Sequence, residues 1–290
     1  NWENDKLNGS GTVYTKDNSM YYKGEFKDSE FSGKGVCLYE NGDRYEGLWK
    51  FGKRHGRGKL QYKSGDKWYD GNWEEDQMTG RGTLSLSREK YEGYFKDGLF
   101  HGDGTYYYAT QEIYYGNWVE GKRNGRGKIT LPNGSWYEGE WVNDRKFGYG
   151  KFFSPTIGTY EGYFKNDKFD GKGKIVFLNN ESYEGDWLDG FKIKGKFTYM
   201  NGDVYDGLWE MNEKHGVGVM IFSSGDSYQG EFRNDNITGI GRYEYRNGDI
   251  YEGELKMGLK EGTGKMTYAS GAVYEGLWKK NKKSGGGGFL

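Results

Sequence analysis

Three histidines carry the readiest acid–base and metal-binding chemistry in this 290-residue sequence. His55, His101 and His215 each stand directly before the first glycine of a Gly-x-Gly run, at the same place in a repeated pattern. Other copies of the pattern have Ser, Thr, Asn, Asp or Glu at this place, which is typical of a loop position that accepts any small or polar group. We therefore interpret the histidines as loop residues and expect neither a catalytic nor a metal site from them.

Glycine-rich runs could be taken for phosphate-binding loops. The runs at 56–59 and 171–174 read Gly-Arg-Gly-Lys and Gly-Lys-Gly-Lys, without the Gly-x4-Gly-Lys-Ser/Thr spacing. Nothing near them reads as a strand that leads into a helix N-terminus, which is the element that supplies an anion site. We therefore expect no nucleotide and no other cofactor.

Carboxylates recur directly after the first tyrosine of each copy. A pair of carboxylates can hydrolyse a glycosidic bond, but an active site is a singular feature and this ladder is repeated. Because Lys and Arg recur in the following strand, we expect cross-strand ion pairs on a solvated face, and a protein that is not an enzyme. The carboxylates are Glu46, Glu92, Glu138, Glu161, Glu184, Glu252 and Glu275.

Composition excludes several other classes. The 42 Lys and Arg balance 43 Asp and Glu, which argues against broad attraction to nucleic acid or anionic lipid. No stretch approaches 18 apolar residues and no cleavable leader is seen, so we expect neither a membrane-spanning helix nor a secretory signal. The single cysteine, Cys37, excludes an internal disulfide, and an aromatic content of 18% argues against disorder.

The 52 glycines are periodic, and the period defines the domain organisation. The triplet Tyr-x-Gly recurs about every 23 residues, with Phe or Trp at +4 and Gly at +11 and +13 in nearly every copy, counting from the tyrosine. We expect one continuous array over 1–290, with both ends reading as cuts through a longer array. It comprises a partial repeat at 1–21, repeats that start at Tyr22, Tyr45, Tyr69, Tyr91, Tyr114, Tyr137, Tyr160, Tyr183, Tyr205, Tyr228 and Tyr251, and a last partial repeat at 274–290.

Each repeat reads as a β-hairpin. Residues 137–141, Tyr-Glu-Gly-Glu-Trp, alternate in the period-2 pattern of a strand, and a polar loop follows, as at 50–55 in the second full repeat. The returning strand ends in an Asn-Gly or Ser-Gly turn such as Asn41-Gly42, a strong hairpin signal. The predicted fold is all-β: an elongated, twisted, single-layer antiparallel sheet of about 12 stacked hairpins of ~23 residues, without helices.

Rings laid over glycines of neighbouring strands would stabilise such a sheet, because no helix covers it. Exposed apolar surface of more than a few hundred Å² marks interaction sites, so we expect part of the stripe to remain open as a groove that binds a partner protein. The alternative is that the rings pack against one another and cover the groove themselves. The candidate groove residues are Tyr45, Trp49, Tyr69, Trp73, Trp118, Tyr137, Trp141, Trp187 and Trp209.

The repeat resembles a known family. Residues 45–49, Tyr-Glu-Gly-Leu-Trp, followed by His-Gly-Arg-Gly at 55–58, are similar to the MORN repeat (membrane occupation and recognition nexus), and the resemblance covers essentially the whole chain. It implies a cytoplasmic, non-enzymatic scaffold, often dimeric, that anchors other proteins to cytoskeletal or membrane-apposed structures. Settings of the family include the division and cortical cytoskeleton of protozoan parasites and the radial spokes of cilia. The repeat-only, Lys- and Asn-rich character is most similar to the long MORN proteins of protists.

The C-terminal repeats have an uneven charge. Residues 201–250 hold 4 Lys and Arg against 9 Asp and Glu, whereas 251–290 hold 7 against 4. Together with the family's habit of dimerising through its C-terminal repeats, this predicts a tail-to-tail homodimer that buries Leu255, Trp278 and Phe289. The final lysines are either a guard against strand addition or a lipid contact. They are Lys279, Lys280, Lys282 and Lys283.

The first functional hypothesis is thus a scaffold that dimerises and docks proteins in the cytoskeleton of a protist. The alternatives are a radial-spoke component and a module that binds phosphoinositides or membranes. A net charge of −1 disfavours the membrane alternative, since anionic headgroups attract clusters of 4–8 cations.

Overall fold

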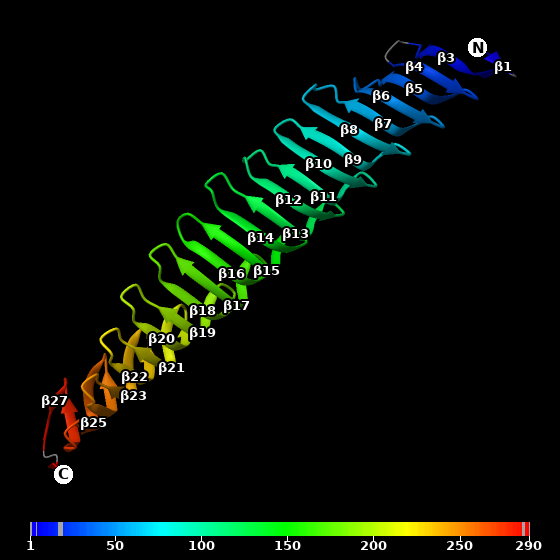
Figure 1. The fold of residues 1–290 in the computed structure, drawn as a ribbon. Coiled ribbons are helices and arrows are strands. Elements are labelled where there is room, and N and C mark those ends of the chain that lie inside the picture. Colours follow the sequence, from blue (N-terminus) through cyan, green and yellow to red (C-terminus); the bar gives the residue numbers. More distant parts are fainter. Residues whose placement is uncertain (1, 4, 17–19, 286–287, 290) are drawn as a thin grey trace. The chain divides into compact units, whose positions relative to one another are not determined.

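The computed structural model describes residues 2–3, 5–16, 20–285 and 288–289, the first and last of these ranges by their backbone alone. The chain forms two compact units, Asn1–Arg145 and Lys146–Leu290, each of which is built only from strands and turns over the described residues (Figure 1). No helix there could span a membrane. The predicted all-β fold of stacked hairpins is confirmed.

In the first unit, the strands from β3 onward pair antiparallel in chain order, while β1 and β2 pair only with each other. No pairing joins β3 to β14 in the described residues, so the sheet is open. The strands are β1 (Trp2–Glu3), β2 (Lys6–Leu7), β3 (Gly9–Tyr14), β4 (Tyr21–Lys27), β5 (Glu30–Leu38), β6 (Arg44–Lys50), β7 (Lys53–Gln61), β8 (Lys67–Glu74), β9 (Gln77–Leu86), β10 (Glu89–Lys96), β11 (Leu99–Tyr107), β12 (Ile113–Val119), β13 (Lys122–Thr130) and β14 (Trp136–Val142).

In the second unit the strands from β15 to β27 also pair antiparallel in chain order, and β28 pairs back onto β26. The strands are β15 (Arg145–Ser154), β16 (Gly158–Lys165), β17 (Lys168–Phe177), β18 (Ser182–Leu188), β19 (Phe191–Thr198), β20 (Val204–Glu210), β21 (Glu213–Ile221), β22 (Ser227–Arg233), β23 (Asn236–Glu244), β24 (Ile250–Lys256), β25 (Leu259–Thr267), β26 (Val273–Lys279), β27 (Lys282–Lys283) and β28 (Gly288–Phe289).

Two kinds of turn join the strands, and they differ from the predicted ones. The segment predicted as a polar loop at 50–55 is a two-residue turn, Phe51-Gly52, with both residues at positive φ (51° and 71°), as in a type I′ hairpin. The Asn41-Gly42 turn is longer: the Gly42 N–H donates to the Tyr39 carbonyl and the Tyr39 N–H to the Asp43 carbonyl. Asn-Gly therefore ends a three-residue loop here, and the tight primed turn lies at the other end of the hairpin.

Glycines at +2 and +13 form a line that crosses every strand of each sheet. In the first unit, for example, Gly24 is paired in register with Gly35, Gly35 with Gly47, and Gly47 with Gly58. Along each strand, successive side chains point to opposite faces of the sheet. One side, the ring face, carries the tyrosine at 0 and the aromatic residue at +4; the outer face carries residues +1, +3, +12 and +14.

A β-bulge follows the glycine line inside most hairpins. In the second full repeat the register shifts by two residues between Gly47 and Trp49, so that Leu48 alone lies opposite residues 55–57 of the returning strand. Gly56 takes the bulge position with φ of 63°. The hairpin of Tyr183 is one residue shorter and has Lys194 at +11, and its register shift falls instead between Asp186 and Trp187.

Candidate binding surfaces

The repeat tyrosines form the innermost layer of the ring face. Each of the twelve hydroxyls donates to the backbone carbonyl at +3 of its own repeat, with O···O distances of 2.8–3.2 Å. The rings lie over glycines of the line: Tyr45, for instance, covers Gly47 and Gly58, and in the shorter hairpin Tyr183 covers Gly185 and Gly195. Burial raises the pKa of Tyr22, Tyr228 and Tyr251 to about 12, which keeps these phenols neutral donors.

The aromatic residue at +4 links each tyrosine to the tyrosine of the preceding repeat. In the first unit this edge-to-face ladder runs without a break from Tyr22 through Trp49 and Tyr45 to Tyr137, with centroid distances of 5.0–5.6 Å and interplanar angles of 81–90°. Tryptophan at +4 also donates from its indole N–H to a line glycine, as Trp73 does to the Gly58 carbonyl at 3.1 Å. In the second unit, Leu255 takes this position between Tyr228 and Tyr251.

A residue at +9 closes the ring face from above, and it occurs in two forms. In the apolar form the side chain packs on the repeat's own tyrosine, as Phe31 stacks on Tyr22 with centroids 3.7 Å apart. In the basic form a cation lies over aromatic rings: Arg54 lies over the +4 ring of the next repeat, Trp73, at 4.2 Å, whereas Lys214 lies over Tyr199 at 5.2 Å. In either form, we call the contact that the +9 residue makes with the adjacent hairpin the clamp.

The residue type at +9, apolar or basic, correlates with the residue type at +7 of the next repeat. An apolar +9 residue is followed by glycine, whose N–H donates to the +9 carbonyl, as from Gly52 to Phe31. A basic +9 residue is followed by Asp or Asn, whose side-chain oxygen accepts from the +9 backbone N–H, as Asp76 accepts from Arg54 at 3.0 Å. The apolar pairs are Phe31–Gly52, Met78–Gly98, Phe100–Gly121, Phe169–Gly190 and Ile237–Gly258. The basic pairs are Arg54–Asp76, Arg123–Asp144, Lys146–Asp167, Lys192–Asn212, Lys214–Asp235 and Lys260–Asn281.

Lys192 differs from the arginines in its counter-charge. Its ammonium lies 4.0 Å from the centroid of Trp209 and 4.9 Å from that of Phe197, and its clamp partner is the neutral Asn212. Burial lowers the pKa of Lys192 to about 8, against the smaller opposing effect of Asp235. The Lys192 ammonium thus lies against ring faces and makes no ion pair with a described carboxylate.

The ring-face groove that the sequence predicts is filled. All nine predicted groove residues are buried, with exposed fractions of 0–7%: Tyr45, Trp49, Tyr69, Trp73, Trp118, Tyr137, Trp141, Trp187 and Trp209. The expectation that this stripe is open to a partner is therefore corrected. Its physical reason is the clamp, because the +9 side chains cover the tyrosines and the +4 rings pack between neighbouring repeats.

The other predicted sites are placed as follows. Leu255 and Trp278, expected at a dimer interface, are each 5% exposed within their own chain, and the side chain of Phe289 lies outside the described residues. Lys279, Lys280 and Lys282 are exposed, while the Lys283 ammonium lies over Tyr274 at 4.6 Å. His215 contacts Glu210 at 3.2 Å, and the described residues contain no group of three metal-binding side chains.

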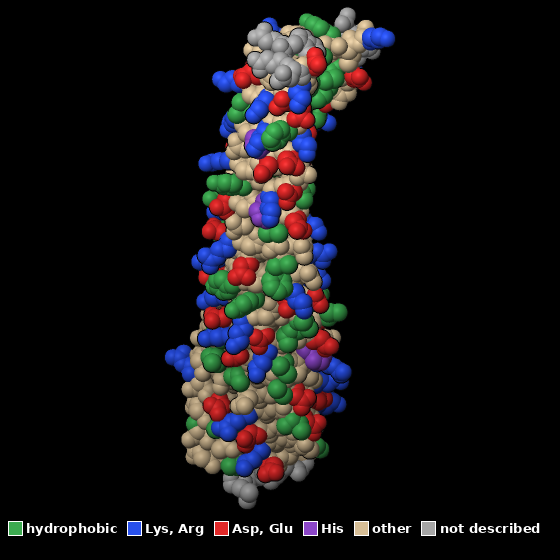
Figure 2. Space-filling view, turned by 90° about the vertical axis from the view of Figure 1, so that its right-hand side faces the viewer, with side chains coloured by type: hydrophobic (Ala, Val, Ile, Leu, Met, Phe, Trp, Pro, Cys, Tyr) green, Lys and Arg blue, Asp and Glu red, His purple; other side chains and the backbone are tan. Residues whose placement is uncertain are grey.

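The outer face carries the predicted carboxylate ladder. Glu138, Glu161 and Glu184 pair with lysines of an adjacent strand at 3.2 Å, which confirms the expected cross-strand ion pairs. Figure 2 shows that cationic, anionic and hydrophobic side chains are interspersed on the surface in view. Several hydrophobic side chains on the outer face are exposed, among them Tyr163 (49%) and Ile240 (68%).

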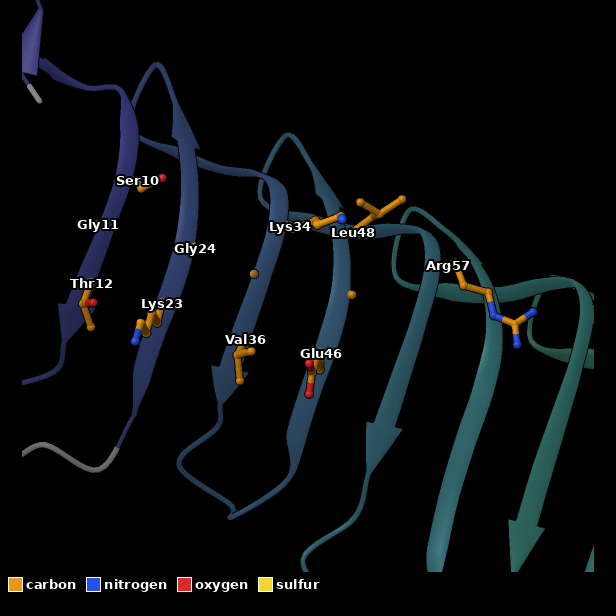
Figure 3. Close-up of a pocket in the computed structure, with 12 residues that line it drawn as sticks. Ser10, Gly11, Thr12, Lys23, Gly24, Lys34, Val36, Glu46, Leu48 and Arg57 are labelled. Carbon is orange, nitrogen blue, oxygen red and sulfur yellow. The ribbon is translucent and has the colours of Figure 1, made fainter.

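A groove follows the glycine line on the outer face of the first unit. It has a volume of about 870 Å³ and crosses β3, β4, β5 and β6 to reach Arg57 on β7 (Figure 3). Gly11, Gly24, Gly35 and Gly47 form its floor, and the side chains on either side of the line form its walls. One wall contains Lys23, Val36 and Glu46, and the other contains Lys34, Leu48 and Arg57.

A second groove occupies the corresponding place in the second unit, with different chemistry. It has a volume of about 670 Å³ and lies over Gly162, Gly173, Gly185 and Gly195. Its lining cations are outnumbered by carboxylates, and one of its lysines, Lys174, is paired with Glu184 at 3.2 Å. Both grooves thus have a floor of line glycines, but the charges of their walls differ.

Sequence reasoning missed the clamp and the outer grooves. The clamp has a readable signal, since the residue type at +9 matches the residue at +7 one repeat later in eleven consecutive pairs. The grooves have no such signal, because the missing side chains of the line glycines belong to the ring face and the grooves depend on the outer-face residues beside the line.

Comparison with protein families identifies the repeat. The MORN repeat model matches thirteen segments, which together span most of the chain: 1–20, 22–44, 45–67, 69–87, 91–112, 114–136, 137–156, 160–181, 183–204, 205–227, 228–250, 251–273 and 274–287. Among curated proteins nothing matches.

Solved structures that match have low similarity. The TCP10 domain of Danio rerio CPAP is 14% identical over 86% of this chain and 95% of its own, with a TM-score of 0.28. The SAS-4 TCP domain of Drosophila melanogaster, in complex with a proline-rich motif of Ana2, is 12% identical over 61% of this chain and 85% of its own, with a TM-score of 0.30. A streptogramin B lyase reaches a TM-score of 0.15 at 10% identity over 94% of this chain and 91% of its own. At these TM-scores the likenesses carry no argument.

Proposed function

Because this chain belongs to the MORN repeat family, we propose that it is a non-enzymatic scaffold that docks partner proteins in a cytoskeletal assembly. Repeats of this family indicate a protein- or membrane-binding scaffold. The finer proposal is a cytoplasmic, cytoskeleton-associated protein of the division or cortical cytoskeleton of a protist, which forms homodimers through its C-terminal repeats.

The docking role is supported by the difference between the two faces of the sheet. The ring face uses its aromatic side chains for the chain's own stability, so it offers little surface to a partner. The outer face is built on the same glycine line but presents exposed apolar and charged side chains beside two grooves. A surface that contributes little to folding is free to vary its side chains from repeat to repeat.

Regular spacing also suits a scaffold. Each repeat adds two strands, so equivalent outer-face positions recur about every 10 Å along the sheet of each unit. Partner segments can therefore be held at fixed intervals, with specificity set by the local side chains. A catalytic role would need a singular cluster, whereas the titratable groups in the described residues follow the repeat.

The proposed homodimer must use other residues than Leu255 and Trp278. Leu255 and Trp278 already pack inside their own repeats, whereas Ile240 and Leu277 project from the outer face with 68% and 51% of their surfaces exposed. Sedimentation equilibrium of the purified chain tests this part: a mass of twice 33.3 kDa at micromolar concentration supports it, and a monomer rules it out.

Extraction of native cells tests the scaffold role against the membrane alternative. Tagged chain should remain with the cytoskeleton after a non-ionic detergent has dissolved the membranes, and it should be released by agents that disassemble filaments. Release by detergent alone would favour membrane binding. A tagged variant with Lys279, Lys280, Lys282 and Lys283 all changed to Gln should be retained equally, because the proposal assigns these lysines no docking role.

A further inference from the structure

The outer groove of the first unit has free positive charge. Of its lining cations, Arg57 pairs with Asp70 at 2.9 Å, whereas Lys23 and Lys34 make no ion pair with any described carboxylate. The carboxylate of Glu25 accepts from the Lys34 backbone N–H at 3.1 Å, and Glu46 pairs with Arg44 at 2.7 Å. Two ammonium groups therefore stand beside the groove without a carboxylate partner among the described residues.

The width of the groove selects an extended chain. Its two walls are residues i and i+2 of the same strands, which lie about 7 Å apart along a strand. A helix with its side chains is about 10 Å or more across and is too wide for this space. An extended backbone fits, and it can approach the floor closely because the strand residues between the two walls direct their side-chain positions to the ring face.

The length of the groove sets the number of residues. From β3 to β7 it crosses four strand intervals of about 4.8 Å, or roughly 19 Å, which corresponds to about six extended residues. The floor glycines use their N–H and C=O groups in the sheet, so the floor offers van der Waals contact, and the walls provide specificity. Val36 and Leu48 offer apolar contact, while Lys23 and Lys34 attract negative charge.

We propose that this groove binds an extended acidic peptide segment, with apolar side chains on Val36 and Leu48 and carboxylates on Lys23 and Lys34. The inference rests on the proposed docking function and names the class of partner for one docking site. Charge complementarity favours this occupant, because the equivalent groove of the second unit has carboxylates in excess. A membrane is disfavoured, since two unpaired lysines fall short of the 4–8 clustered cations that anionic headgroups need.

Fluorescence anisotropy with the full 290-residue chain tests the proposal. The probe is a fluorescein-labelled nine-residue peptide, three copies of Glu-Pro-Leu, which favours an extended conformation. We expect binding with a Kd on the order of 100 μM at low salt, weakening as salt rises. Peptides with Lys in place of Glu, or with Ser in place of Leu, should bind at least tenfold more weakly. No binding of the acidic probe up to millimolar protein would overturn the proposal.

Two matched pairs of variants locate the site. The double change Lys23→Gln and Lys34→Gln should weaken binding about tenfold, whereas Lys172→Gln with Lys196→Gln alters the net charge equally on the other unit and should leave it within twofold. Leu48 and Leu208 occupy the same repeat position, lie against Gly56 and Gly216 respectively, and are 36% and 38% exposed. Leu48→Ser should weaken binding about fivefold and Leu208→Ser should not, at equal cost to thermal stability.

Equal losses in both members of a pair would overturn the assignment to this groove. A further control uses vesicles of phosphatidylcholine with one-fifth phosphatidylserine. If the chain sediments with these vesicles and the Lys23/Lys34 double variant does not, the ligand of the groove is a membrane surface and the peptide proposal is overturned. If the peptide fails to bind but the chain stays with the detergent-insoluble cytoskeleton, the scaffold function stands and this inference alone falls.

Discussion

A glycine at +2 or +13 is required by the tyrosine that lies over it. At Gly58, a Cβ would stand 2.6 Å from a ring carbon of Tyr45 and closer still to its hydroxyl oxygen. The hydroxyl is itself fixed by its 3.0 Å hydrogen bond to the Leu48 carbonyl, so the ring has no free direction in which to move. The +11 glycine has another reason, the positive φ of the bulge, which is why the shorter hairpin can replace it with Lys194.

Gly58→Ala and Gly11→Ala therefore should have opposite effects. Both residues lie on the glycine line, but a Cβ at Gly11 would meet only Phe26 at 3.4 Å, an ordinary contact. We expect Gly58→Ala to destabilise the first unit by about 1–3 kcal/mol through overpacking. Gly11→Ala should be neutral or stabilise by up to about 1 kcal/mol, because it restricts the unfolded chain. Urea unfolding of both variants checks this, and similar losses would contradict the steric explanation.

Lys192 predicts a dependence of stability on pH. Its pKa is lowered to about 8 in the folded chain by burial, from an ordinary value of 10.5, with Lys214 lowering it and Asp235 and Glu181 raising it. Between these two values the unfolded chain binds more protons, so the contribution of Lys192 to stability rises with pH above about 8 and is flat below it. Comparison of urea midpoints at pH 7 and 9.5 should show a gain for wild type that Lys192→Met lacks. Lys194→Met, at an exposed neighbour, should retain the gain.

At the scale of the hairpin, the clamp determines how one element is held by the next. Both forms cover the same tyrosine ring, but they solve the hydrogen bonding of the turn differently. In the apolar form, glycine leaves room and donates once. In the basic form, an Asp or Asn at positive φ accepts from the +9 N–H and, when it is Asp, also neutralises the cation, as Asp76 does for Arg54 at 2.9 Å.

A double-mutant cycle tests whether the two clamp residues act as a unit. Arg54→Phe leaves the Asp76 carboxylate without its cation, and Asp76→Gly leaves the guanidinium over Trp73 without a counter-charge. We expect each single change to destabilise by about 1–2 kcal/mol, and the double change, which recreates the Phe31–Gly52 form, to recover most of that loss. The interaction free energy, which is the effect of the double change minus the sum of the two single effects, should be about 1–3 kcal/mol and stabilising. Additive effects would show that the matching of +9 with +7 is not energetic.

The hairpins and the stacking of rings on glycine could be predicted from sequence, because the period-2 pattern and the spacing of Tyr45, Gly47 and Gly58 indicate them directly. The location of the tight turn could not, since Asn-Gly serves both turn types and Phe51 at positive φ is a poor local signal. The prediction that the rings are exposed was wrong for a different reason. Their burial depends on Arg54 and the other +9 residues, which pack against the adjacent hairpin, and the sequence of a single repeat does not encode this contact.

At the scale of the whole chain, contacts join each repeat to its immediate neighbours. The Tyr–Trp ladder, the clamps and the strand pairing all connect adjacent hairpins, so within each unit stability is a sum of nearest-neighbour contributions. The ladder is not uniform, because Leu255 interrupts it between Tyr228 and Tyr251. Aromatic pairs add about 0.5–1.5 kcal/mol beyond burial, so the repeats beside Leu255 should open before those at the centre of the first unit.

Trp141→Ala provides the sharpest test of this nearest-neighbour behaviour. The change removes ring contacts to Tyr114 and Tyr137, the cation of Arg123 above the indole, and the 3.1 Å hydrogen bond to the Gly127 carbonyl. We expect a local loss of about 3–5 kcal/mol, the range for truncation of a large buried aromatic residue. Hydrogen exchange resolved by peptide should show lost protection in the hairpins around 114–150, while those between 205 and 276 keep theirs. A uniform loss of protection would mean that the array folds as one cooperative unit instead.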